Sequence, residues 1–152
     1  MTGESDVKVG FLYKIISAIY QAIYREIGDD AWEILWKSGE ILFDCIKDEV
    51  PVSKDMKLED AISNLSRYIR ATHIVRDINY IIDRERRAIE YQISFLIPLR
   101  YERREEAGPI YIFSSLFVAL MNYLGYTVCK DREPRITEDN TLIERWRFKL
   151  KS

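Results

Sequence analysis

Residues able to perform acid–base or nucleophilic chemistry are few in this chain, and they stand apart from one another. His73 is the single histidine, and one imidazole does not readily build a His-rich metal site or a conventional catalytic triad. The sequence contains no Gly-rich phosphate loop, GxSxG elbow or HExxH helix. His73 falls at the junction between an expected helix and an expected strand. We therefore expect a structural or surface role for His73, and we expect no catalytic residues.

The two cysteines, Cys45 and Cys129, are too few for a disulfide framework and lack CxxC spacing. Cys45 falls on the apolar side of an expected helix and Cys129 falls in an expected strand. Both are expected to be small core residues rather than reactive thiols. The paired acidic residues stand at helix starts or in loops, where capping and solvation explain them. These pairs are Asp29/Asp30, Glu59/Asp60 and Glu105/Glu106.

Six arginines gather near the two ends of one expected strand. Acidic residues interleave with them, and the formal net charge of the whole chain is −2. A nucleic-acid site requires a local excess of positive charge, so we expect a solvated hairpin tip and loop here, and no nucleic-acid partner. These arginines are Arg84, Arg86, Arg87, Arg100, Arg103 and Arg104.

Large apolar side chains at helical spacing are harder to assign to the core alone. Trp32 and Trp36 lie one turn apart near Gly39. Phe113 and Phe117 show the same spacing on another expected helix. Core packing is the usual explanation of such stripes, but several amphipathic helices on one sheet carry more apolar surface than the sheet covers. The residues expected to line a ligand pocket are Trp32, Trp36, Phe43, Phe113, Phe117 and Met121.

Apolar periodicity predicts the helices that position these residues. Spacings of three and four recur in four segments, and glycine or proline marks the ends of several of them. The predicted helices cover residues 8–27, 31–49, 57–72 and 108–124.

The period then changes from 3.6 to 2, which indicates strands. Residues 74–82 and 89–97 alternate on either side of a charged tip and predict a long antiparallel hairpin with one apolar face. Two more strands are expected at 126–132 and 142–150, separated by a polar loop over 134–141. In the last strand we expect Trp146, Phe148 and Leu150 to face inward.

The resulting order, ααα-ββ-α-ββ, predicts an α+β fold in which a four-stranded antiparallel sheet packs with amphipathic helices. The chain has 152 residues, 47% of them hydrophobic and 32% charged, which is typical of one globular domain. The first residues do not resemble a signal peptide. The apolar runs fall short of the roughly 18 residues of a spanning helix. We therefore expect a cytoplasmic protein without a membrane span.

The segment 31–42, AWEILWKSGEIL, resembles an early helix of the 4-vinyl-reductase domain family. This family comprises small-molecule (hydrocarbon) binding domains related in fold to the core subunits of the TRAPP tethering complex. The resemblance continues as helix, hairpin, helix and closing hairpin over residues 31–150. The family's small-xxx-small spacing is supplied here by Ser115 and Ala119. Trp146-Arg147-Phe148 stands in place of a family Cys-x-Phe ending.

The same region carries the main departure from the family. Many relatives have cysteines near the last strand, consistent with metal binding. Here Trp146 occupies the position of the second family cysteine, and Cys129 is isolated. The family's glycine-aspartate pair is also absent. We expect no metal and no other cofactor.

The resemblance implies that the chain binds or senses a hydrophobic small molecule, a hydrocarbon or acyl chain, between the helices and the sheet. We expect a homodimer in which the helix within residues 1–28, with its separate stripe of tyrosines, is the dimerisation element. A non-catalytic interaction scaffold related to TRAPP subunits, without a ligand, is the alternative. A reductase, as the family's name suggests, ranks last because no nicotinamide or flavin motif is recognisable.

Overall fold

The computed structural model describes residues 3–96 and 104–151 and confirms the predicted α+β class. Four helices and four longer strands follow one another in the predicted order ααα-ββ-α-ββ. The helices are α1 (Gly3–Ile27), α2 (Ala31–Ile46), α3 (Leu58–Ala71) and α4 (Gly108–Tyr123). The strands are β1 (Val75–Asp83), β2 (Ala88–Phe95), β3 (Tyr126–Lys130), β4 (Arg135–Ile136) and β5 (Thr141–Leu150). Short 3₁₀ turns, η1 (Gly28–Asp30) and η2 (Arg104–Glu106), precede α2 and α4.

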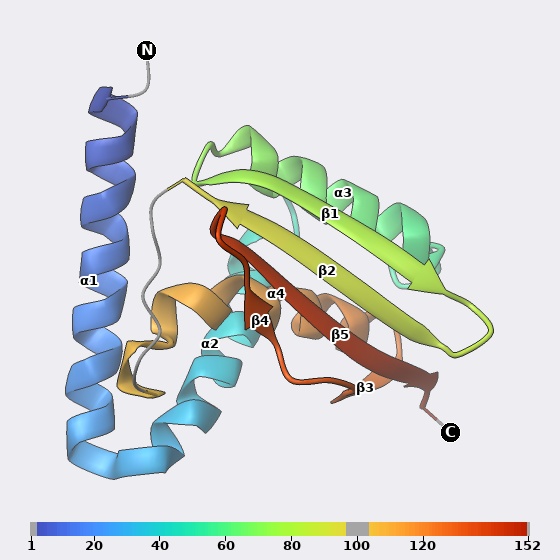
Figure 1. The fold of residues 1–152 in the computed structure, drawn as a ribbon. Coiled ribbons are helices and arrows are strands. Elements are labelled where there is room, and N and C mark those ends of the chain that lie inside the picture. Colours follow the sequence, from blue (N-terminus) through green and yellow to red (C-terminus); the bar gives the residue numbers. More distant parts are fainter. Residues whose placement is uncertain (1–2, 97–103, 152) are drawn as a thin grey trace.

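The strands form one antiparallel sheet in the order β1-β2-β5-β3 (Figure 1). The additional strand β4 has two residues and lies in the segment predicted to be a loop. It pairs with Leu142 and Ile143 of β5, whereas β3 pairs with β5 from Trp146 to Leu150. β4 therefore satisfies backbone groups of β5 that β3 does not reach.

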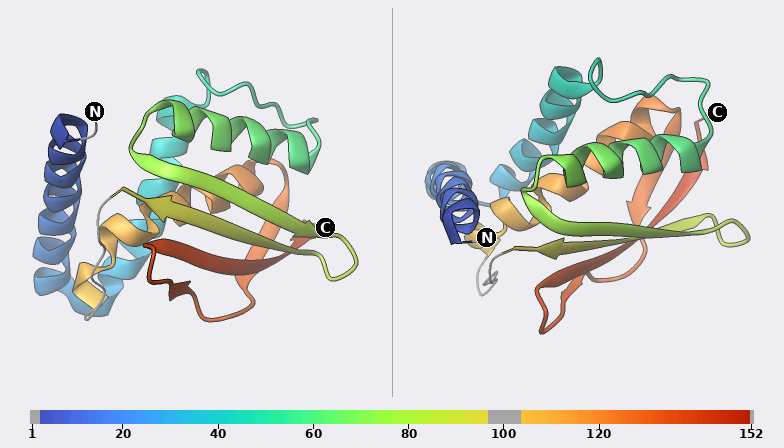
Figure 2. Two further views of the ribbon diagram at one scale, coloured as in Figure 1. Left: turned by 45° about the horizontal axis from the view of Figure 1, so that its top comes forward. Right: turned by 90° about the horizontal axis from the view of Figure 1, so that it is seen from above.

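The helices form layers over one face of the sheet, as the two views in Figure 2 show. α3 packs on β1, α4 packs on β3, and α2 packs on α4. α1 stands at one end of the molecule and contacts α4 and η2. α4 lies in the centre of this arrangement, since 12 of its 16 residues are buried.

Gly39 of α2 lies directly against Ser115 of α4. A Cβ atom built on Gly39 would stand 2.5 Å from the carbonyl carbon of Ser115, well inside van der Waals contact. Only a residue without a side chain permits this approach of the two helices. Both residues belong to the segments on which the family resemblance rests.

α1 turns its tyrosines toward the rest of the chain. Tyr13 and Tyr20 are buried, and the Tyr13 hydroxyl donates a hydrogen bond of 2.7 Å to the carbonyl oxygen of Ile74. An aliphatic stripe beside them is largely exposed: Ile15 is 41% and Ile19 is 58% accessible. The tyrosine stripe therefore serves packing within the chain, and the aliphatic stripe is the open face of this helix.

The strand faces follow the predicted alternation with two corrections. Leu150, predicted to face inward, is 67% exposed, since it pairs with Tyr126 at the end of the edge strand β3. Val75, which strict alternation would place on the opposite side of β1 from Ile78, is buried. An irregularity in register between Val75 and Asp77 turns both Val75 and Ile78 toward the core. A local bulge of this kind breaks the period of two.

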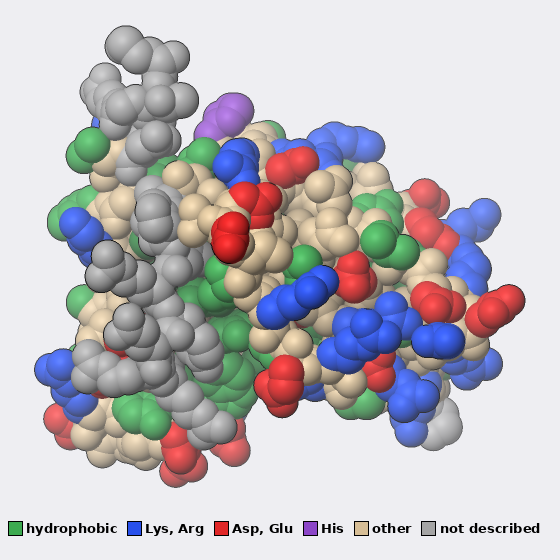
Figure 3. All heavy atoms as spheres, viewed as in Figure 1, with side chains coloured by type: hydrophobic (Ala, Val, Ile, Leu, Met, Phe, Trp, Pro, Cys, Tyr) green, Lys and Arg blue, Asp and Glu red, His purple; other side chains and the backbone are tan. Residues whose placement is uncertain are grey.

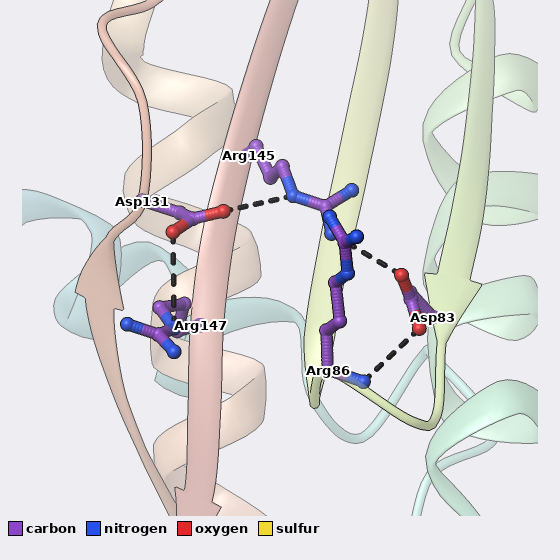
Figure 4. A network of polar contacts seen from close by, with 5 residues as sticks. All are labelled: Asp83, Arg86, Asp131, Arg145 and Arg147. Atoms are coloured by element: carbon purple, nitrogen blue, oxygen red, sulfur yellow. Dashed lines mark hydrogen bonds and ion pairs between the residues drawn. The ribbon is translucent and has the colours of Figure 1, made fainter.

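The outer face of the sheet is polar, and charged side chains gather over it in Figure 3. Arg145 of β5 lies between two carboxylates, at 2.8 Å from Asp131 and 3.4 Å from Asp83 (Figure 4). Arg147 lies 3.7 Å from Asp131. The backbone N–H of Arg86 donates to Asp83 and, as the largest cause, lowers the pKa of that carboxyl. This network joins β5 to the β1–β2 hairpin and to the segment after β3.

Candidate functional site

A pocket of about 650 Å³ opens between α2, α4 and the end of the sheet formed by β3 and β5. Four aromatic rings belong to its wall: Trp32 and Trp36 from α2, Tyr111 from α4 and Trp146 from β5. Glu144 of β5 completes this group. We call this hollow the aromatic pocket.

The four rings form a continuous edge-to-face series. Tyr111 and Trp32 have ring centroids 5.4 Å apart, Trp32 and Trp36 5.9 Å, and Trp36 and Trp146 5.5 Å. Their interplanar angles are 68°, 76° and 78°. Edge-to-face pairs of this kind are favourable beyond the area they bury. The wall is therefore held in shape by contacts among its own rings.

The position of the two α2 tryptophans follows from the packing of that helix. α2 buries Ala31, Leu35, Gly39 and Phe43, which recur every four residues and share one face. Trp32 and Trp36 each follow a residue of this face, so they lie about 100° around the helix. They are half-buried and project beside the contact with α4 instead of into it.

Glu144 is a buried carboxylate on the inner face of β5, only 4% exposed. The hydroxyl of Ser114 on α4 donates a hydrogen bond to it. Burial raises the pKa of Glu144 to about 7, and the Ser114 hydrogen bond and the positive charge of Lys130 oppose this rise. The ion pairs found among the described residues do not include Glu144. Its charge is therefore poorly compensated by the chain itself.

Tyr91 of β2 stands opposite Glu144 in the strand register. Its hydroxyl donates to the sulfur of Met121 at 3.3 Å. The pKa of Tyr91 is raised, first by burial and second by the charge of Glu144. This side of Glu144 is therefore occupied by a neutral phenol and offers it no positive charge.

The remaining charged residues of the aromatic pocket are mostly acidic. Asp29, Glu40 and Glu133 line it, and the one basic lining residue that the structure describes is Lys130. Lys130 lies 2.9 Å from Glu133, so much of its charge is already compensated. The electrostatic potential in the pocket is consequently negative whenever Glu144 is ionised.

The structure brings two of the six predicted pocket residues to this site. Trp32 and Trp36 line it, whereas the other four are buried core residues that are absent from its described wall. Phe43 packs on Tyr123, Phe113 on Phe95 and Phe117 on Tyr91, with centroids 5.3, 6.1 and 4.4 Å apart. Contact of a ligand with Phe43, Phe113, Phe117 or Met121 stays a prediction.

The pocket residues that sequence reasoning missed include Tyr111, Glu144 and Trp146. A signal for Glu144 exists in the sequence, since Leu142, Glu144 and Trp146 share one phase of an alternating strand. A single carboxylate on the apolar side of a strand costs free energy unless it is partnered or functional. Tyr111 has no comparable signal, because its position depends on how α4 meets α2.

The other chemically notable residues lie away from the aromatic pocket. His73 is exposed in the turn between α3 and β1, with a positive φ of 58°, as predicted for a junction residue. Arg84, Arg86 and Arg87 are exposed at the hairpin tip. Arg100, Arg103 and the side chain of Arg104 lie outside the described residues.

The prediction that the cysteines are core residues was wrong, because Cys45 and Cys129 are both exposed. Cys45 falls outside the face of α2 that packs on α4. Cys129 lies on the edge strand β3, where one side of the strand is open. Among residues 3–96 and 104–151, no group of three or more His, Cys, Asp or Glu side chains is arranged to hold a metal ion.

No family model and no curated protein matches this chain. Within the part of the chain that the structure describes, no helix has the length and apolar character needed to cross a membrane.

Proposed function

We propose that this chain is a non-catalytic module that binds or senses a hydrophobic small molecule in the aromatic pocket. The observation that carries the proposal is a hollow of about 650 Å³ walled by four aromatic rings. Small-molecule sites typically enclose about 300–1,000 Å³ and combine apolar walls with a few polar groups. Trp32, Trp36, Tyr111 and Trp146 supply the apolar wall, and Glu144 supplies the buried polar group.

The rigidity of the wall supports binding. Trp146 belongs to a strand paired on both sides, and Trp36 packs edge-on against it. A preformed wall reduces the entropy lost when a ligand is immobilised. Apolar ligand surface removed from water contributes about 25 cal/mol per Å². Shape and desolvation would therefore provide most of the affinity.

The arrangement of polar groups supports binding without catalysis. Ser114 and Glu144 form a hydroxyl–carboxylate pair beside the pocket, but Ser114 is buried and is not among the residues that line the pocket. An attacking hydroxyl must reach its substrate. In this geometry Ser114 positions the carboxylate instead.

A homodimer is part of the proposal. Phe11, Ile15 and Ile19 lie one turn apart on α1 and are 65%, 41% and 58% exposed. A contiguous exposed apolar stripe of this kind is typical of an interaction surface. The i, i+4 spacing forms a ridge that a second copy of α1 can pack against.

Two further expectations stay proposals. We place the dimer in the cytoplasm. We also propose that the chain belongs to the 4-vinyl-reductase family, which the Gly39–Ser115 contact supports.

Native mass spectrometry of freshly purified protein tests the binding function. We expect the wild-type chain to retain a small-molecule mass that is absent from variants with a filled pocket. Ala119→Phe and Val118→Phe both enlarge a residue of the pocket wall, and circular dichroism would verify that each variant is folded. If the wild-type chain and the filled variants each showed only the mass of the bare chain, both before and after incubation with hydrophobic compounds, the proposal would be contradicted.

The alternative function, a ligand-free interaction scaffold, is favoured by the exposed stripe of α1. A scaffold requires the stripe but not the pocket. A protein that dimerises through α1 and shows no ligand in any preparation would support the scaffold and exclude the binding module.

A further inference from the structure

We propose that the aromatic pocket selects a ligand whose apolar body carries a protonated amine, with the ammonium group held among the rings and paired with Glu144. The inference rests on the proposed function, because it names the class of ligand for the same pocket. Its basis is the juxtaposition of a buried carboxylate with four aromatic rings in one pocket wall.

The first argument is the incomplete partnership of Glu144. This side chain is 96% buried, being 4% exposed, and Ser114 is the hydrogen-bond donor that the described residues provide for it. Tyr91, opposite on β2, directs its hydroxyl to Met121 instead. A buried carboxylate is stable as an anion only with a positive partner or several donors. A ligand that brings a positive charge supplies what the chain lacks.

The second argument is the chemistry of the wall. Indole and phenol rings carry negative π faces, and a cation within about 6 Å of a ring centroid is attracted to them, most strongly by tryptophan. Three of the four rings belong to tryptophan. The ring series ends at Trp146, which stands two residues from Glu144 on the same face of β5. One ammonium group can therefore contact both a ring face and the carboxylate.

The third argument is the charge around the opening. The carboxylates of Glu40, Glu133 and Glu144 line the pocket, against Lys130 among the described basic residues. Lys130 is engaged by Glu133 at 2.9 Å. A wall of this charge attracts cations and repels anions, so a fatty acid or another anionic amphiphile is a poor fit.

A fourth observation concerns Trp146, which is 9% exposed. Its indole Nε1–H has no hydrogen-bond acceptor among the described residues. A buried donor without an acceptor costs free energy. This N–H is a second polar point of the wall, and an ammonium group cannot satisfy it because it carries no acceptor.

A series of three ligands with one apolar body tests the inference. These are 2-phenylethylamine as the cation, 2-phenylethanol as the neutral analogue and 3-phenylpropanoate as the anion. Binding is measured by isothermal titration calorimetry at pH 8 and by tryptophan fluorescence. Fluorescence reports on the pocket directly, because all three tryptophans of the chain line it. We expect the amine to bind at least about tenfold more tightly than the alcohol, with the carboxylate weakest.

Glu144→Gln identifies the residue responsible. This variant should lose about tenfold or more in affinity for the amine, while affinity for the alcohol changes by less than about twofold. Glu90→Gln, which removes a carboxylate from the outer face of β2, should leave both affinities unchanged. The order of affinities of the three ligands for the wild-type protein tests the cation preference even if Glu144→Gln does not fold.

The outcomes separate the inference from the function on which it rests. If the alcohol binds as tightly as the amine with saturable one-to-one binding, the cation preference is refuted and the proposed function stands. If none of the three ligands gives a saturable signal at millimolar concentration, and native mass spectrometry shows no retained mass, both are refuted.

Discussion

Ser114 on the central helix α4 donates a hydrogen bond to Glu144 on strand β5, and both side chains are buried. The pair joins the helical layer to the sheet beside the aromatic pocket. It also fixes where the carboxylate points. The chain thus positions an ionisable group in its interior and supplies one neutral donor for it.

Replacing Glu144 by Gln should make stability less dependent on pH. Burial raises the pKa of this carboxyl from 4.5 to about 7, so the folded state holds a proton that the unfolded state releases. Stability from this group is complete below pH 4.5, declines as pH rises, and is lost above about pH 7. The full pKa change corresponds to about 3 kcal/mol. Urea unfolding should therefore show Glu144→Gln gaining roughly 2 kcal/mol relative to wild type between pH 5 and pH 8.

Glu90→Gln is the matched control, since Glu90 belongs to the neighbouring strand but lies on the outer face. Its difference from wild type should change far less over the same pH interval. An equal gain for both variants would show that the effect arises from general surface charge and would contradict a special environment for Glu144.

Gly39→Ala should destabilise the fold, because the added Cβ would meet the backbone of Ser115 at 2.5 Å. Overpacking of this kind typically costs about 1–3 kcal/mol. Gly10→Ala is the control, since nothing lies within 4 Å of a Cβ there, and it should stabilise α1 by up to about 1 kcal/mol. Denaturation in urea measures both. A stabilising Gly39→Ala would show that α2 and α4 do not approach as described.

The double variant Ile15→Lys/Ile19→Lys should convert the proposed homodimer into a monomer. Both residues lie on the exposed stripe of α1, where two lysines would be desolvated on dimerisation. Light scattering after size exclusion should give twice the chain mass of 18.1 kDa for wild type and once that mass for the variant. Ile81→Lys, on the outer face of β1 and 56% exposed, should remain dimeric. A monomeric wild type would refute the dimer.

Arg145→Met should destabilise the protein more than Arg147→Met. The Arg145 side chain is 13% exposed and bridges Asp131 and Asp83, whereas Arg147 is 64% exposed and lies 3.7 Å from Asp131. Water screens the second contact more strongly. We expect a loss of about 1–2 kcal/mol for Arg145→Met and less than about 0.5 kcal/mol for Arg147→Met. Equal losses would contradict the bridging role.

The element order was predictable because helices and strands impose different apolar periods on the sequence. The period of 3.6 in residues 31–46 and of 2 in residues 89–95 locates α2 and β2 without any tertiary information. The sequence did not predict the features that depend on neighbouring strands. The register irregularity in β1 belongs to its pairing with β2, and the exposure of Leu150 and the pairing of β4 depend on how far β3 extends along β5.

The candidate site was predictable only in part for the same reason. Trp32 and Trp36 were identified because they lie one turn apart near Gly39. Phe113 and Phe117 have identical spacing, yet they face the core, since α4 is covered on nearly all sides. Helical spacing indicates which residues share a face but not what covers it. Glu144 could be recognised in the sequence as a charged residue among the inward-facing positions of β5. Tyr111 could not, because it joins the site only through the approach of α2 to α4.

The most direct test of the binding function is energy transfer from the pocket tryptophans to N-phenyl-1-naphthylamine, a neutral hydrophobic fluorophore. All three tryptophans of the chain line the aromatic pocket, so a bound probe lies beside every donor. We predict saturable one-to-one quenching of tryptophan emission in the wild-type protein and its loss in folded Ala119→Phe. Quenching that does not saturate, or that is identical in the folded Ala119→Phe variant, would contradict the existence of a ligand site in this pocket.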